Sequence, residues 1–125
     1  MAKIKIAPAP TFGATVQIPR VGGESLAVGF TFKYLDRLAL AAFIDQQQAD
    51  AQVLVEGVDK RTVVEQAQAE IDVQVKNMLT VVDQWDFEDA LGEDSLRALA
   101  TTFAGAPEAV MSAYFQAYRE ARLGN

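Results

Sequence analysis

Alternating apolar and polar residues mark the first part of the chain as β-structure. Apolar side chains occupy every second position of one run and so fall on one face of a strand: Leu26, Val28, Phe30 and Phe32. A shorter alternation at 15–18 precedes it, and Gly22-Gly23 between the two runs permits the positive φ of a tight turn. The sequence therefore predicts a hairpin that turns across residues 19–24.

A further strand is predicted close to the N-terminus. Lys3-Ile4-Lys5-Ile6 alternates until Pro8 and Pro10, which cannot donate to a strand ladder, interrupt the pattern. We expect a short edge strand followed by an extended segment.

After residue 33 the apolar residues recur every three or four positions, which is the spacing of amphipathic helices. Helices are predicted at 34–48, 60–82, 93–103 and 107–122. Gly92-Glu93-Asp94 supplies the cap and first-turn acids of the third helix, and Pro107 suits the first position of the fourth.

Two features of the helical part allow alternatives. Residues 50–59 are expected to form a connection, although Val53-Leu54-Val55 fits an extension of the first helix or a short strand equally well. The apolar stripe of the second helix, which runs from Val64 through Val75 to Met78, faces either the core of the domain or a partner helix.

These elements predict an α+β fold in one domain, residues 1–125. A small N-terminal antiparallel sheet or hairpin (1–33) packs on about four helices, which form the C-terminal two-thirds of the chain (34–125). Half of the 125 residues are hydrophobic, which is enough for a core without disulfides or metals.

Composition excludes several kinds of chemistry. The chain has neither Cys nor His, so the commonest nucleophiles, general bases and metal ligands are missing. The dense acidic segment 83–94 fails the spacing of a calcium loop, because Trp85 and Phe87 occupy alternate positions after Asp83. We therefore predict no enzymatic activity, no metal and no cofactor, and we interpret the segment as a solvated loop.

Charge is distributed unevenly along the chain. The net charge of −6 argues against a nucleic-acid partner, because phosphate binding requires a basic surface. Residues 1–40 hold five basic and two acidic residues, whereas residues 41–94 hold three basic and thirteen acidic ones. This asymmetry fits a solvated acidic face or, alternatively, a head-to-tail contact between copies. No apolar run approaches the length of a membrane span, so a soluble, unexported protein without a membrane partner is predicted.

A few residues are typical of partner-binding surfaces. Trp85 stands beside the acidic loop, either as an anchor that pins it to the core or as part of a surface. Phe115 lies one residue off the apolar row of the last helix, next to Arg119 and Arg122, which is the composition of a binding hot spot. With the basic N-terminus, the candidate partner-binding residues are Lys3, Lys5, Trp85, Phe115, Arg119 and Arg122.

The order of short segments along nearly the whole chain resembles the tail assembly chaperones of long-tailed siphophages. These segments are the opening 2–12, the run 28–34 that leads into a helix, Trp85-Asp86, the two short helices with their Ala113-Tyr114 step, and the ending 121–125. The Gln- and Ala-rich segment 46–74 departs from the family pattern.

The resemblance implies a chaperone that self-associates, coats the helical tape measure protein, and keeps it soluble until the tail tube protein polymerises around it. It also implies a programmed ribosomal frameshift that makes a minor, longer form to recruit the tube protein. The protein is then expected in the host cytoplasm and not in the mature virion. The alternative is a virion structural tail protein, such as a connector or completion subunit. We further expect an exposed C-terminus that tolerates fusion, with Gly124 ending the last helix.

Overall fold

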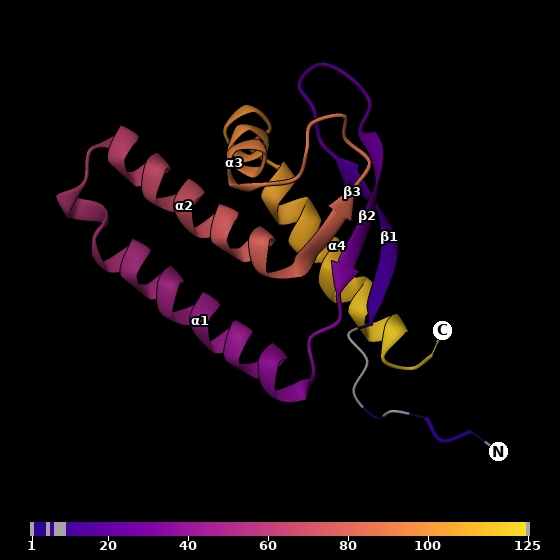
Figure 1. Cartoon of the computed structure of the whole chain (residues 1–125). Coiled ribbons are helices and arrows are strands. Elements are labelled where there is room, and N and C mark those ends of the chain that lie inside the picture. Colours follow the sequence, from indigo (N-terminus) through magenta and orange to yellow (C-terminus); the bar gives the residue numbers. More distant parts are fainter. Residues whose placement is uncertain (1, 5, 7–9, 125) are drawn as a thin grey trace.

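A one-sided antiparallel sheet with helices on its apolar face forms the centre of the molecule (Figure 1). The computed structural model describes residues 2–4, 6 and 10–124. In chain order the elements are β1 (Thr11–Ile18), β2 (Leu26–Lys33), α1 (Arg37–Glu56), a 3-10 turn (Val58–Lys60), α2 (Val63–Val81), β3 (Val82–Trp85), α3 (Glu93–Thr102) and α4 (Ala106–Ala121). The predicted α+β fold with four α-helices is confirmed.

The predicted hairpin is formed by β1 and β2. Val16 pairs with Val28 and Ile18 with Leu26, so that the apolar residues of both strands lie on the same face. Gly22 has a φ of 68°, which a residue with a side chain rarely adopts, and it allows the tight turn. The opposite face of the hairpin carries mainly small and polar side chains and faces solvent.

A third strand, β3, is the main difference from the predicted elements. It pairs antiparallel with β2, so that Trp85 lies opposite Phe30 and Val82 opposite Phe32, with an irregularity between these pairs. The sequence predicted a helix up to residue 82, because Val82 continues the apolar spacing of α2. Val82 forms a strand and not a further helical residue, because pairing with β2 satisfies the backbone groups on that edge of β2 and still buries the Val82 side chain.

The predicted N-terminal edge strand is not observed. Residues 3, 4 and 6 belong to no strand, and β1 begins only at Thr11, four residues before the alternation recognised in the sequence. An isolated strand without a partner has no ladder hydrogen bonds to stabilise it. Lys5, Pro8 and Asn125 lie outside the described residues.

Helix α1 is shifted and longer than predicted. It begins at Arg37 because the Asp36 carboxylate caps it, accepting a hydrogen bond from the Ala39 N–H at 2.8 Å. It continues to Glu56, so residues 50–56 are helix and not a connection. Val53-Leu54-Val55 therefore extends the first helix, which is one of the two alternatives that the sequence left open. Ala and Gln favour helix, and pairs four residues apart add support, such as the Gln46 amide that donates to Asp50 at 3.0 Å.

Helix α2 begins at Val63, after a capping box in which Thr62 and Glu65 satisfy each other's backbone N–H groups. Only its second half faces the core. Val75 and Met78 are buried, but Val64, which was predicted on the same stripe, is 66% exposed. The first half of α2 projects with α1 away from the sheet as a helical hairpin (Figure 1).

Helix α4 covers the apolar face of the sheet and completes the core. Its buried side chains, Val110, Tyr114 and Tyr118, join the apolar faces of β1 and β2 and the inner sides of α2 and α3 in one cluster. Among the described residues no helix is long and apolar enough to cross a membrane.

Two tyrosine hydroxyls tie α4 to the junction between the sheet and α1. Tyr114 donates to the Lys33 carbonyl at 3.0 Å, and Tyr118 donates to the Leu35 carbonyl. Tyr118 also stacks on Tyr34, with ring centroids 4.7 Å apart. Burial raises the pKa of both phenols to about 12, because the phenolate form is poorly solvated there.

Replacing Tyr114 by Phe is expected to lower the free energy of unfolding by about 1 kcal/mol, because the Lys33 carbonyl loses its buried donor. The pKa of Tyr114 is raised on folding, so its contribution to stability is complete below pH 10 and is lost as the pH rises towards 12. Urea unfolding from pH 8 to about pH 12 should therefore show a smaller alkaline loss in Tyr114→Phe. Equal losses in both proteins would contradict this.

Candidate functional site

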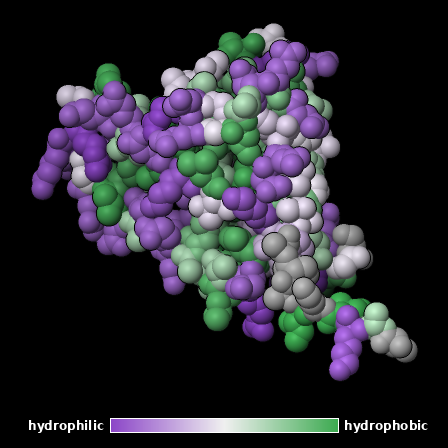
Figure 2. All heavy atoms as spheres, viewed as in Figure 1, coloured by the Kyte–Doolittle hydropathy of each residue, from purple (hydrophilic) through white to green (hydrophobic). Residues whose placement is uncertain are grey.

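Helix α1 contributes little to the core and leaves much of its apolar surface open. Of its 20 residues only Phe43 is buried. Large apolar side chains of the α1–α2 hairpin are exposed, including Leu38 (83%), Val55 (71%) and Val63 (88%). In Figure 2 green, hydrophobic atoms break the purple surface over this hairpin and over the centre of the same face. Single exposed apolar side chains are common on proteins, so a binding region requires a hollow or patch in which several of them meet.

A groove lies between the first turns of α1 and the last turn of α4, and we call it the α1–α4 groove. It has a volume of about 440 Å³ and is lined by Tyr34, Arg37, Leu40, Ala41, Ile44, Tyr118 and Arg122. The stacked rings of Tyr34 and Tyr118 belong to its lining. Apolar side chains together with two guanidinium groups can accept the apolar stripe of a helix and pair with carboxylates beside that stripe.

The three candidate residues in and just after α4 have different roles, and the structure brings two of them, Phe115 and Arg122, close to α1. Arg122 lines the α1–α4 groove. Phe115 is half-buried and packs against Phe43 of α1, with ring centroids 6.4 Å apart, so it fastens the two helices together. Arg119 is exposed, and its Nε donates to the Phe115 carbonyl at 3.5 Å.

The α1 side of the groove was missing from the candidate residues. Leu40 and Ile44 form an apolar row beside the row that carries the core contacts. The sequence predicted a helix over these residues as part of the helical layer packed on the sheet, and none of them was assigned to a partner-binding surface. The capped start at Asp36 aligns α1 so that Ala41 and Ile44 remain exposed at the groove.

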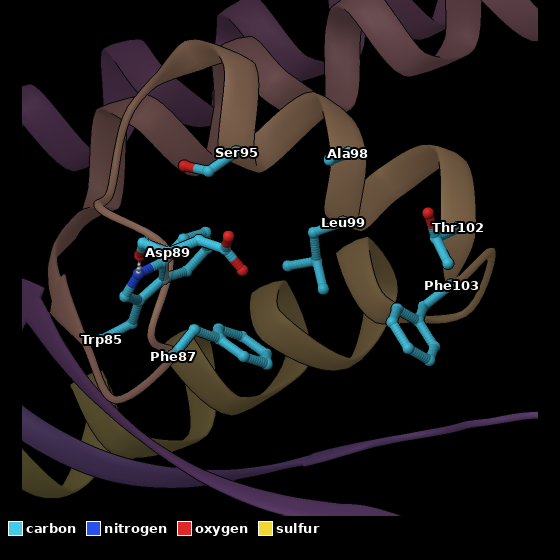
Figure 3. A pocket seen from close by; sticks show the side chains of 8 residues that line it. All are labelled: Trp85, Phe87, Asp89, Ser95, Ala98, Leu99, Thr102 and Phe103. Atoms are coloured by element: carbon cyan, nitrogen blue, oxygen red, sulfur yellow. Dashed lines mark hydrogen bonds between the residues drawn. The ribbon is translucent and has the colours of Figure 1, made fainter.

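Trp85 does not line the α1–α4 groove and lies at the end of β3 (Figure 3). Its indole N–H donates to the Asp89 carbonyl at 2.8 Å, and its ring packs edge-on against Phe30 and Phe87, with centroids 6.0 and 4.9 Å away. Trp85 therefore anchors the β3–α3 loop, as one of the two sequence interpretations expects.

The same tryptophan forms a wall of a second hollow, which we call the loop pocket. It lies between the β3–α3 loop and α3, has a volume of about 220 Å³, and is lined mainly by apolar side chains, among them Trp85, Phe87, Leu99 and Phe103. An adjoining shallow hollow shares Trp85 and Phe87 and has three acidic residues in its lining, Asp83, Glu88 and Asp89. Lys3 lies exposed in the N-terminal segment, and Lys5 is not among the described residues.

The polar side chains of the described residues form no evident metal centre. Within them, no group of three or more acidic side chains is arranged to hold a metal ion. The carboxylate of Asp50 has its pKa lowered chiefly by the hydrogen bond from Lys76, whose Nζ lies 2.9 Å from Asp50 Oδ2. This pair joins α1 to α2 and is a structural contact.

Comparison with known proteins identifies the family. The family model described as phage tail assembly chaperone matches residues 1–125 of the chain. No curated protein and no solved structure matches it. The family match covers the whole chain, including the segment 46–74, whose short sequence segments do not resemble those of the family. It therefore confirms the resemblance. The chain belongs to the phage tail assembly chaperone family.

Proposed function

We propose that the chain, acting as one domain over residues 1–125, binds the tape measure protein and keeps it soluble until the tail tube protein polymerises around it. Family membership supports a chaperone role in tail assembly. The observation that carries the finer proposal is the α1–α4 groove, which lies beside a long helix with a single buried side chain.

The proposed contact is a helix laid in a groove. The apolar stripe of a tape measure helix would rest on Leu40, Ala41 and Ile44, and its flanking acidic side chains would pair with Arg37 and Arg122. Covering that stripe removes it from water and from other tape measure chains. The net charge of −6 favours solubility of the complex. The role requires no bond making or breaking, so we propose a non-enzymatic protein.

Two neighbouring alanines of α1 allow a matched test. Ala41 and Ala42 are both exposed, but only Ala41 lines the groove. Arginine favours helix almost as well as alanine, so neither substitution should unfold α1. We expect Ala41→Arg to fill the groove and weaken tape measure binding at least tenfold, or about 1.4 kcal/mol, whereas Ala42→Arg binds as the wild type does.

The measurement is the fraction of co-expressed tape measure protein that stays soluble and co-purifies with each variant. Circular dichroism of the purified variants serves as the control for folding. If Ala41→Arg and Ala42→Arg solubilise the tape measure protein equally well, the groove is not the binding site. If the wild type does not solubilise it, the tape measure protein is not the partner.

We also propose that copies of the chain self-associate, because one tape measure protein is long and one groove is short. The basic residues 1–40 and the acidic residues 41–94 favour a head-to-tail contact, in which different patches of two copies meet. Such a contact leaves one groove per copy available along the partner.

A longer form made by ribosomal frameshifting is proposed to recruit the tail tube protein. Its added residues would follow α4, where Arg122 and Leu123 are exposed and Gly124 has the left-handed φ of 79° that the sequence predicts. None of these residues belongs to the core cluster. An extension at this point would therefore leave the packing of α4 intact.

A soluble domain fused after Leu123 is therefore expected to leave the melting temperature of this fold within about 2 °C of the unfused protein. Differential scanning calorimetry of the fused and unfused proteins checks this. A fall of many degrees would mean that an extension disturbs α4, and the longer-form proposal would fail.

The chaperone is proposed to act in the host cytoplasm and to be absent from the mature virion. Its rival, a structural tail protein such as a connector or completion subunit, would remain in the particle. A mass-spectrometric inventory of purified virions should find the tape measure and tube proteins without this chain. Recovery of the chain in amounts comparable to those of the tail proteins would favour the structural alternative.

A further inference from the structure

The N-terminal segment exposes isoleucines that the described structure leaves uncovered. Ile4 is 93% and Ile6 100% exposed, and Lys3 beside them is exposed as well. Large aliphatic side chains this open to water gain stability from any apolar surface that covers them. We call residues 2–6 the arm; its described positions are 2–4 and 6.

The loop pocket is a hollow of the right chemistry for such side chains. Figure 3 shows Trp85 and Phe87 on one side and Leu99 and Phe103 on the other, with open space between them. Because the Trp85 indole is fixed by its hydrogen bond to the Asp89 carbonyl, this wall is formed before any ligand arrives. A volume of about 220 Å³ has room for a branched aliphatic side chain.

The rim of the loop pocket complements the charge of the arm. The Asp89 carboxylate points towards Leu99 in Figure 3, and Asp83 and Glu88 line the adjoining hollow. Within the described part of the chain, no Lys or Arg forms an ion pair with these three carboxylates. A cation that accompanies an apolar side chain into this region therefore finds acidic partners.

The order of side chains along the arm matches an apolar pocket with an acidic rim. In an extended chain residues 4 and 6 point to the same side, about 7 Å apart, and residue 3 points to the other. One side of the arm can then enter the apolar pocket while Lys3 reaches the acidic rim.

We infer that the arm of one copy docks at the loop pocket of the next copy, with one isoleucine of the pair Ile4 and Ile6 in the pocket, the other against its edge, and Lys3 at the acidic rim. The inference rests on the proposed self-association and assigns the two surfaces that would form it. A second copy is the occupant because the described arm residues are exposed and do not cover their own pocket. Arm and pocket are different patches, so the contact repeats head to tail. Its area is small, which predicts weak, reversible association.

The test uses two variants of the full chain that each lack one half of the contact. The arm variant carries Ile4→Ser and Ile6→Ser. The pocket variant carries Ala98→Arg, since Ala98 is exposed and lines the pocket, so that the new side chain fills the pocket without entering the core. Thr101→Arg, at an exposed position of α3 outside the loop pocket, is the matched control.

Sedimentation velocity over a range of concentrations measures the association. We expect the wild type and Thr101→Arg to form oligomers, and each variant alone to associate at least tenfold more weakly. A mixture of the two variants should form dimers and nothing larger, because it contains one intact arm and one intact pocket for each pair. The emission of Trp85, the single tryptophan, should change with dimer formation.

Each other outcome counts against a different statement. If the wild type associates and both variants associate equally well, self-association stands and the arm-to-pocket contact is wrong. If the wild type is monomeric throughout, the proposed self-association fails and this inference fails with it. If the arm substitutions change the Trp85 emission of a monomer, the arm occupies its own pocket and the second copy is excluded. Solubilisation of the tape measure protein, measured on the same variants, tests the chaperone role separately.

Discussion

The contact between α4 and the junction of β2 with α1 determines how the rest of the molecule is arranged. The hydroxyl groups of Tyr114 and Tyr118 satisfy the carbonyls of Lys33 and Leu35, where the chain leaves the sheet and can no longer form ladder hydrogen bonds. This junction fixes the direction in which α1 departs, and Tyr118, stacked on Tyr34, also lines the α1–α4 groove. Fold and candidate binding surface therefore depend on one set of hydrogen bonds and one ring stack.

The α1–α2 hairpin is attached to this centre less firmly than α3 and α4 are. Phe43 is the single buried side chain of α1, and the contacts nearer the tip are polar, such as the Arg61 guanidinium that donates to the Leu54 carbonyl at 3.1 Å and the ion pair of Asp50 with Lys76. Segments with few buried apolar contacts open locally at a lower free energy than the core does. The tip of this hairpin is therefore expected to open at a lower free energy than the sheet and α4.

The parts of this structure that could be predicted are those in which local pattern and tertiary contacts agree. The hairpin followed from alternation that also forms the core, and α3 and α4 followed from spacing that also faces the core. β3 could not be predicted, because Val82 fits both a helical stripe and a strand and the choice depends on an edge of β2 distant in sequence. The full length of α1 stayed one of two alternatives, because residues 46–56 are stabilised by Ala, Gln and side-chain pairs and carry no regular apolar spacing.

The candidate site, like the fold, has residues that the sequence could predict and residues that depend on how the helices pack. The aromatic and basic composition of α4 directed attention to its last turns, and Arg122 does line a groove there. Whether Ala41 and Ile44 are covered depends on the angle between α1 and α4, which one sequence does not specify. Phe115 shows the converse, since its position off the apolar row suggested a free surface, whereas α1 turns it inward against Phe43.

The placement of α4 has a consequence for the order in which the protein can fold during synthesis. The carbonyls of Lys33 and Leu35 receive their hydrogen bonds from residues 81 and 83 positions later in the chain. The apolar face of the hairpin therefore remains without its cover until α4 has left the ribosome. A groove built on α4 therefore becomes available to a partner only on chains that have been translated through this helix.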